Sequence, residues 1–232
     1  MIDEALEALK KFDFGTSIDV VAEIDAAAIE SNTKPELQKE LEGKLIASLD
    51  SGLTRDGKDY VCRKLALIGS AACVPALSAL VTTEANSHLA RHALERIPGL
   101  EATKAIQDAI GKTNGRIKIG LIGSLALRRD KSSIALLASL LKETDATIAR
   151  AAALAVGTLG GSQAVRVLQD AMSSTTTDKT FVMDALLSCA ESMLANGQSS
   201  EAVSIYKSLS ADNQSRLVRL AATRGLLACA NA

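Results

Sequence analysis

Apolar positions recur along the middle of the chain with a period of about 30 residues, which is typical of repeat proteins. The recurring anchor of this pattern is Leu65, Leu94, Leu125 and Val156. Twelve positions after each anchor, a second apolar residue follows: Leu77, Ile106, Leu137 and Leu168. Stacked helical hairpins show such a period because no single hairpin can bury its own apolar face. Residues 55–174 are therefore predicted to form four hairpins of two helices each.

The turns of these hairpins are predicted where glycine, proline or charged residues interrupt the apolar pattern. First helices should end near Gly69, Pro98, Arg129 and Gly160. Second helices should end near Thr82, Lys112, Lys142 and Ser173. In the third copy Arg128-Arg129-Asp130 replaces the glycine turn, which leaves the angle of that hairpin open.

Residues 1–54 lack the repeat and are predicted to form an N-terminal helical cap. Helices are expected at about 3–12 and 17–30. A third should follow a capping box formed by Thr33 and Glu36, with leucines at every fourth position in one stripe: Leu37, Leu41, Leu45 and Leu49. Such a segment would cover the open face of the first repeat.

Residues 175–232 are predicted to be C-terminal helices that continue the array. A polar run at 173–178 precedes them, and Asp178 is expected to cap a helix at 179–195. One partial hairpin resembles a tetratricopeptide unit through Gly197, Ala202, Tyr206 and Leu209. The segment LVRLAATRGLL at 217–227 parallels IARAAALAVGT at 148–158. We therefore expect one continuous α-solenoid over residues 1–232 rather than two domains.

Three segments resemble bacterial HEAT-like repeats, of the type also found in phycobilisome lyases. They read VCRKLALIGSAACVPALSAL, HLARHALERIPGLEATKAI and IARAAALAVGTLGGSQAVRVL. The resemblance implies an all-α, armadillo-like fold of HEAT-like helical hairpins and a non-catalytic scaffold that binds proteins. It also leaves open an enzyme subunit similar to a phycobilisome lyase. No catalytic residue carries over from that family, and a bilin pocket would be expected to use aromatic side chains.

The amino-acid composition supports a helical core and argues against some classes of binding partner. Hydrophobic residues make up 47% of the chain but aromatic residues only 2%, and there is no Trp. Few aromatics argue against base-stacking surfaces for single-stranded nucleic acid. The net charge of −1 hides an asymmetry, because residues 1–54 carry −7, residues 55–174 carry +6 and residues 175–232 carry 0.

The four cysteines match neither a zinc ribbon nor a redox CxxC pair. They are predicted to be free, mostly buried thiols, so a reducing compartment is the default expectation. The N-terminal residues contain no apolar run of signal-peptide length, and no segment has the apolar length of a membrane span. A cytoplasmic location is therefore the default, with no membrane partner.

Candidate chemistry is sparse. His88, His92 and Glu95 share one helical face and could hold a metal ion, but a solvated face is the favoured interpretation. Gly111-Lys112-Thr113 imitates the end of a phosphate-binding loop, yet Ile106 occupies the position of its required glycine. The sequence therefore assigns no catalytic, cofactor-binding or metal-binding residue and implies no cofactor.

The basic excess of residues 55–174 is the main argument for nucleic acid, since HEAT-like DNA-repair glycosylases use such arrays on DNA. The first helices and their turns carry a net charge of +6, whereas the second helices carry none. In HEAT-type arrays the second helices usually line the concave face, so this charge is expected on the convex side. An ion pair of Asp59 with Arg63 would also mean that part of this positive charge stabilises the fold. These points argue against nucleic acid as a partner, because its binding needs many phosphate contacts on one surface of the protein.

The second helices are predicted to carry the working surface. Positions 13 and 14 past each anchor should point away from the apolar stripe and leave a groove for an extended peptide or protein. An alternative is that they are only solvated helix faces. The predicted protein-binding surface consists of Gln107, Asp108, Ser139, Lys142, Arg166, Gln169 and Asp170.

Overall fold

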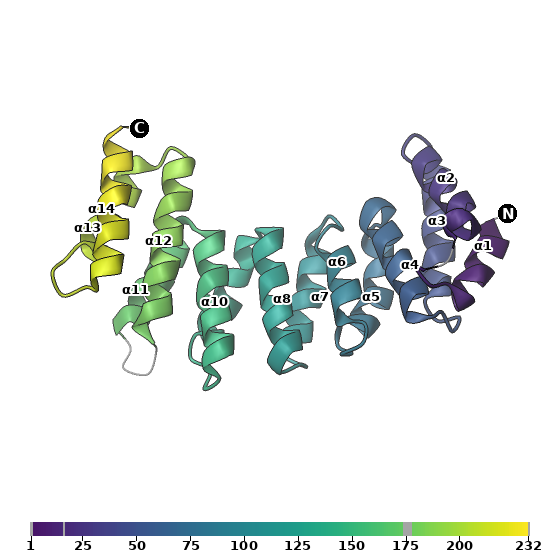
Figure 1. Ribbon diagram of the computed structural model, residues 1–232, viewed down its shortest axis with the longest axis horizontal. Coiled ribbons are helices and arrows are strands. Elements are labelled where there is room, and N and C mark those ends of the chain that lie inside the picture. Colours follow the sequence, from purple (N-terminus) through teal and green to yellow (C-terminus); the bar gives the residue numbers. More distant parts are fainter. Residues whose placement is uncertain (1, 16, 174–177, 232) are drawn as a thin grey trace. The chain divides into compact units, whose positions relative to one another are not determined.

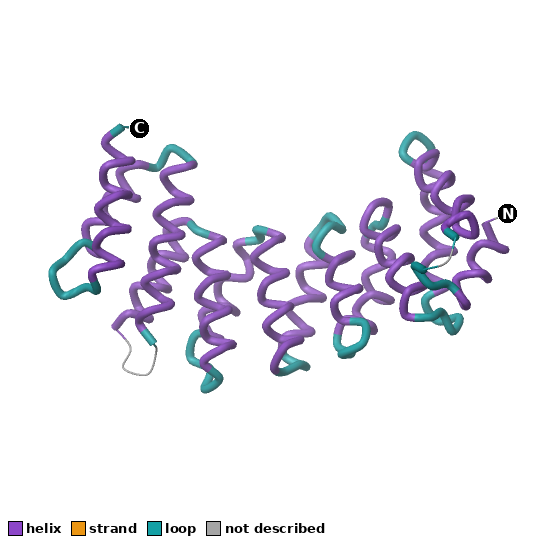
Figure 2. The backbone as a smooth tube through the Cα atoms, viewed as in Figure 1, coloured by secondary structure: helices purple, strands orange, loops and turns teal. Residues whose placement is uncertain are grey.

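The computed structural model describes residues 2–15, 17–173 and 178–231. Within those ranges the regular elements are fourteen α-helices and four short 3-10 helices, without a strand (Figure 1, Figure 2). The predicted fold class, an all-α array of HEAT-like helical hairpins of the α-solenoid type, is confirmed. The chain divides into two compact units, Met1–Ser124 and Leu125–Ala232, with the boundary inside one helix. The single continuous solenoid remains a prediction.

The first unit begins with three short helices, as the sequence predicted. They are α1 (Ile2–Ala8), α2 (Ala22–Ser31) and α3 (Pro35–Ser48). Short 3-10 helices follow α1 at Leu9–Lys11 and precede α2 at Ile18–Val21. Of the leucine stripe on α3, Leu41, Leu45 and Leu49 are buried and Leu37 is half-buried. The stripe therefore forms the inner face of α3.

The capping box predicted before α3 is wrong. Lys34 occupies the N-cap position and makes no side-chain capping hydrogen bond. The hydroxyl of Thr33 instead donates to the carbonyl oxygen of Glu30 at 3.3 Å, at the end of α2. The tight connection between α2 and α3 leaves the hydroxyl closer to the preceding carbonyl than to the amides of α3.

Polar side chains of the cap attach it to the first hairpin. The carboxylate of Glu42, itself buried, accepts a hydrogen bond from the Ser70 amide at 2.6 Å. The amide of Gln38 donates to the carbonyl oxygen of Ile68 at 2.7 Å. Both contacts satisfy backbone groups at a helix end that would otherwise lack partners.

The eight helices of the repeat region follow the predicted order. They are α4 (Arg55–Ile68), α5 (Val74–Val81), α6 (Ser87–Leu94), α7 (Leu100–Ile110), α8 (Gly115–Arg128), α9 (Ile134–Leu140), α10 (Ala146–Leu159) and α11 (Gly161–Ser173). All four anchors and all four residues twelve positions later are 0% exposed. The repeat register is therefore confirmed. Within each unit, the first helices of the hairpins form one layer and the second helices another (Figure 1).

One turn differs in detail from the prediction, and the structure shows the backbone of the turn that the sequence left open. The helix expected to end near Pro98 ends at Leu94. In the third hairpin Arg129 has a positive φ of 53°, and Gly160, 31 residues later, has a φ of 61°. Arg129 thus adopts the left-handed backbone that glycine provides in the next copy, which is unfavourable for a residue with a Cβ. The third hairpin therefore forms this turn without a glycine, and the backbone at Arg129 is locally strained.

Three helices complete the second unit: α12 (Lys179–Ala195), α13 (Ser199–Leu209) and α14 (Arg216–Ala230). The predicted cap is confirmed, because the carboxylate of Asp178 accepts a hydrogen bond from the Thr180 amide at 2.9 Å. The polar run at 173–178 lies largely outside the described residues, which omit 174–177. Tyr206 on α13 is 2% exposed and packs against Gly225 of α14.

Candidate functional site

The predicted surface residues lie on second helices, as expected, but in both units. Gln107 and Asp108 are on α7 of the first unit. In the second unit Ser139 is on α9, Lys142 follows the end of α9, and three residues are on α11: Arg166, Gln169 and Asp170. Six of the seven side chains are exposed, and Gln107 is half-buried. Of the seven predicted residues, the structure brings together the five of the second unit.

The position 14 residues past each anchor is the outward one. Its side chain is exposed in all four copies: Ala79, Asp108, Ser139 and Asp170. The position before it is half-buried in three copies: Ser78, Gln107 and Ala138. On a helix the residue two steps beyond the buried position is rotated by about 200°, whereas the next residue is rotated by only about 100°. The side chain at the first of these positions is therefore only partly turned away from the core in three copies, and it is exposed in the fourth, at Gln169.

A groove lies between α9 and α11, with a volume of about 510 Å³. Its apolar lining comes from Leu141, Val167 and Ala171. The exposed side chains of Lys142 and Asp170 stand on its rim. The residues lining this groove are Ala138, Ser139, Leu141, Lys142, Val167, Asp170 and Ala171. An apolar floor with charged residues at the edge is typical of a surface that accepts a partner's side chain.

A second groove, of about 300 Å³, lies between α11 and α13. Arg166 and Gln169 stand on its α11 side, and Glu201 and Ser204 on its α13 side. Ile205 and Met193 contribute apolar surface from two helices. The α13 residues were not predicted from the sequence, because the tetratricopeptide-like hairpin was given no surface role. Their spacing next to the buried Ala202 and Ile205 could have indicated an outward face.

The exposed face of α11 forms a ridge between the two grooves. Arg166, Gln169 and Asp170 occupy positions i, i+3 and i+4, so they share that face. The Arg166 side chain donates to the carbonyl oxygen of Ser162 at 3.4 Å, along its own helix. The ridge therefore presents a cation, an amide and a carboxylate within about one turn of helix.

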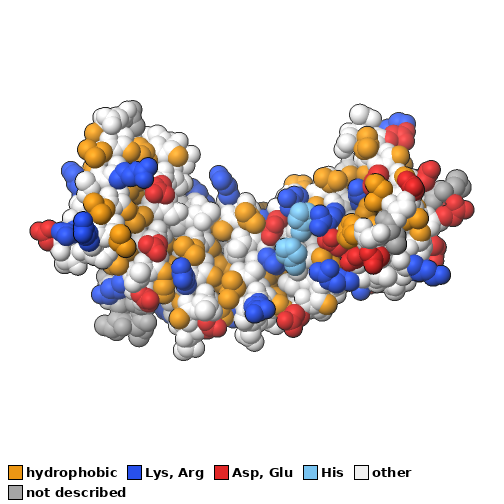
Figure 3. All heavy atoms as spheres, in the orientation of Figure 1, with side chains coloured by type: hydrophobic (Ala, Val, Ile, Leu, Met, Phe, Trp, Pro, Cys, Tyr) orange, Lys and Arg blue, Asp and Glu red, His pale blue; other side chains and the backbone are white. Residues whose placement is uncertain are grey.

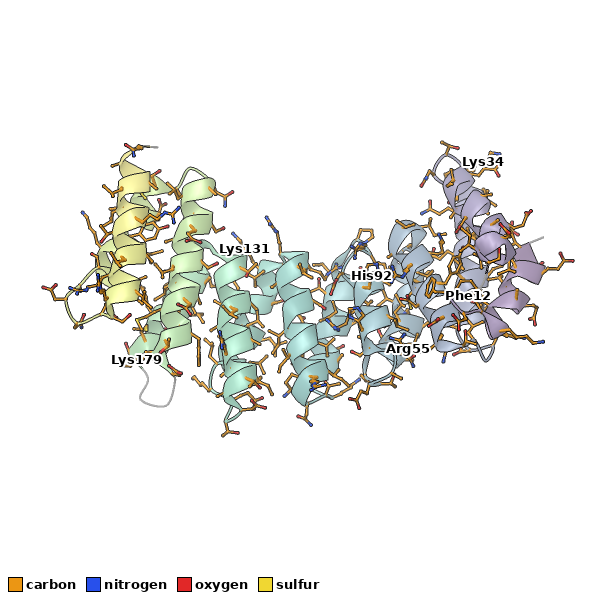
Figure 4. All side chains as sticks on the ribbon, viewed as in Figure 1. Phe12, Lys34, Arg55, His92, Lys131 and Lys179 are labelled. Carbon is orange, nitrogen blue, oxygen red and sulfur yellow. The ribbon has the colours of Figure 1, made fainter. Side chains whose placement is uncertain are left out.

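The histidine face does not have the features of a metal site. The Nδ1 atoms of His88 and His92 lie 3.3 and 3.2 Å from the guanidinium groups of Arg91 and Arg96. Burial, followed by the charges of Arg96 and Arg63, lowers the pKa of His92. Figure 4 shows His92 on the first-helix layer. In the part of the chain that the structure describes, no three His, Cys, Asp or Glu side chains gather in a way that could hold a metal ion.

The expectation that this face is solvated is correct for His88 and wrong for Glu95. The Glu95 side chain is 15% exposed and accepts a hydrogen bond from the Ser124 hydroxyl at 2.6 Å. Helix α8 therefore lies against one side of Glu95, the residue considered as a metal ligand.

Much of the positive charge on the first helices is used within the fold. The predicted ion pair is present, with Arg63 Nε 2.9 Å from Asp59. Lys64 pairs with Asp25 of the cap at 2.6 Å, and Arg91 donates to the carbonyl oxygen of Gly120 at 2.9 Å. Figure 3 shows basic side chains interspersed with acidic and apolar ones on this face. The arrangement lacks the continuous basic stripe that is typical of nucleic-acid binding.

The four cysteines are free thiols, and three of them are buried. Burial raises the pKa of Cys62 and Cys73 to about 12 and that of Cys189 to about 11. A raised pKa keeps each thiol protonated and unreactive at neutral pH. With a disulfide-exchange reagent at pH 8, we expect only the half-exposed Cys229 to react quickly in the native protein. Denaturation without reductant should release four thiols, and a count of two would contradict this assignment.

Comparison with known proteins supports the repeat assignment over part of the chain. Residues 102–186 match the family model for HEAT repeats, from α7 into α12, and this range includes α9 and most of the grooved surface. Among curated proteins, none matches the chain. HEAT repeats typically act as protein-interaction scaffolds and are generally non-catalytic. The finer resemblance to phycobilisome lyases stays a prediction.

The described helices are too short or too polar to span a membrane. Across residues 2–15, 17–173 and 178–231, none combines the length and the apolar character needed to cross a bilayer.

Proposed function

We propose that this protein is a non-catalytic HEAT-repeat scaffold that binds a protein partner as an extended segment along its second helices. In the predicted solenoid this surface is the concave face. The observation that carries the proposal is the pair of grooves flanking α11, each with an apolar floor and polar rims. Five of the predicted surface residues line these two grooves.

The chemistry of the ridge suggests how a segment would bind. Apolar side chains of the partner would enter the two grooves, where burial of apolar surface stabilises the complex. The amide of Gln169 can donate to and accept from an extended backbone. Arg166 and Asp170 would select opposite charges on the two sides of α11, which favours one direction of the bound segment. Main-chain pairing with side-chain pockets on either side is a known mode of peptide recognition.

Selection from a random peptide library displayed on phage, with the full chain as bait, would test this proposal. Peptides selected on the wild-type protein should lose affinity by about tenfold or more for Arg166→Glu with Asp170→Arg, as expected when charges in a groove are reversed. This pair leaves the net charge unchanged, and both side chains are exposed. Asp108→Arg, made alone, would show whether the bound segment reaches α7.

The control reverses two exposed charges on the first-helix side, Arg63→Glu on α4 and Arg96→Glu in the turn after α6. Because Arg63 also loses its ion pair with Asp59, circular dichroism of this variant should match wild type before its binding is compared. Arg91 is unsuitable for this control because its guanidinium is hydrogen-bonded to the backbone of α8. If the control pair abolished peptide binding and the α11 pair did not, the binding surface would lie on the first helices. Peptides whose affinity neither pair changed would also contradict the proposal.

A further inference from the structure

The last helix, α14, has two apolar faces. One face packs on α13, where a Cβ on Gly225 would lie 2.3 Å from the ring of Tyr206. The other face is exposed, with Leu217, Leu220 and Leu227 exposed to 80%, 58% and 64%. Their spacing places these three leucines on one side of the helix. Large leucines in a contiguous exposed stripe indicate an interaction surface rather than a solvated face.

The repeat pattern shows that the N-terminal part of this face is covered in an earlier copy, although the counterparts of Leu220 and Leu227, Ala151 and Thr158, are half-buried and exposed. Leu217 corresponds to Ile148 of α10 at an offset of 69 residues, and Ala221 corresponds to Ala152. Ile148 and Ala152 are 4% and 0% exposed. In α10, therefore, the position of Leu217 is covered by neighbouring helices, whereas Leu217 itself is exposed.

The exposed face of α14 is also positively charged. The helix reads RLVRLAATRGLLACA and contains three arginines and no acidic residue. Arg219 is paired with Asp212 at 3.0 Å. Arg216 and Arg224 are exposed, and helical spacing places Arg224 between Leu217 and Leu227 within the stripe.

A complementary surface exists on α2 and the turn before it. Ile18 and Ile29 are 67% and 72% exposed, and the exposed Ala22 and Ala26 lie between them. Acidic side chains border this stripe: Asp19, Glu23 and Glu30, the last of which also pairs with Lys34. Residues 1–54 carry a net charge of −7. In Figure 3, acidic and apolar side chains gather over the N-terminal helices, and basic, apolar and some acidic side chains lie over the C-terminal helices.

We propose that α14 of one copy of this chain docks on α2 of a second copy, so that copies associate head to tail. The exposed apolar side chains of the two helices would meet, and the arginines of α14 would face the acidic border of α2. Pairing of α14 with itself would bring together two helices that carry arginines and no acidic residue, which is unfavourable. Because the two surfaces differ, the interface is heterologous, and such contacts extend into chains unless they close into a ring.

Sedimentation of the full chain across a range of concentrations would test this association. Two helical faces form a small interface, so we expect a dissociation constant of about 10–100 µM. The weight-average mass should rise above the monomer mass of 24.2 kDa and fall again when salt is added. A mass that stays at the monomer value throughout would overturn the proposal.

Charge-reversal variants identify the two surfaces. Arg216→Glu with Arg224→Glu should remain monomeric, and so should Glu23→Arg with Glu30→Arg, because each variant carries like charges at both ends. Mixing the two variants should restore association, since each then meets an opposite surface. Circular dichroism of each variant should be that of wild type, because all four side chains are exposed.

Other occupants of the α14 face predict different results. If α14 paired with itself, the α2 variant would still associate on its own, because its α14 is unchanged. If α14 bound lipid, the monomeric wild-type chain would sediment with vesicles of phosphatidylserine and phosphatidylcholine, and the Arg216→Glu, Arg224→Glu variant would not. Either result would overturn head-to-tail association.

Discussion

Replacing Leu137 by Ala is expected to lower the free energy of unfolding by about 2–5 kcal/mol, as large-to-small changes in packed cores do. Leu137 is 0% exposed on α9 and belongs to the recurring buried position of the repeat. The loss combines the transfer free energy of the deleted methyl groups with the cavity that they leave. Urea denaturation followed by circular dichroism would measure it.

Leu137→Asp should prevent the second unit from folding, because a carboxylate buried without a partner is far more costly than a cavity. Leu127→Ala is the matched control, since Leu127 is 68% exposed, and we expect a change of at most about 0.5 kcal/mol. A Leu137→Asp protein with the wild-type urea midpoint would show that the repeat register is wrong.

Replacing Gly157 by Val is expected to destabilise the protein by about 1–3 kcal/mol or more, in the range of overpacked cores. A Cβ at Gly157 would lie 2.8 Å from the carbonyl oxygen of Ala185 and 3.0 Å from its Cα. The obstructing atoms are backbone atoms of α12, so α10 and α12 would have to move apart. The thiol of Cys189, which donates to the Gly157 carbonyl at 3.5 Å, would be displaced as well.

Gly43→Val is the control for this change. Gly43 lies within α3, and no atom lies within 4 Å of the position that its Cβ would take. We expect its effect on the urea midpoint to be small, about 0.5 kcal/mol or less, because valine and glycine differ little in helix propensity. An equal loss of stability in both variants would indicate a general effect of valine in helices rather than close packing at Gly157.

The repeat register was predictable because burial recurs with the period of the sequence. Every hairpin must cover its neighbour with the same helical positions, so the apolar pattern appears four times and errors at one copy are corrected by the others. The N-terminal capping box had no such repetition. Thr33 could bond to the helix on either side of it, and only the path of the chain between α2 and α3 decided which.

The candidate surface was predictable in its helices but not in its shape. Exposed positions on α9 and α11 follow from the helical period. The grooves depend on the spacing between neighbouring helices and on α13, whose Glu201 and Ser204 complete the second one. Spacing of that kind is set by packing of side chains across helices, which a one-dimensional pattern does not contain.

By itself, the sequence determined the all-α class, the hairpin register and the free cysteines, since these depend on local periodicity and composition. Only the tertiary structure decided that Gly157 permits close approach of α10 and α12, that Arg91 is tied to the backbone of α8, and that the α14 leucines are exposed. These properties arise between residues far apart in the chain. Their free energies depend on distances and burial that exist only after the helices have packed.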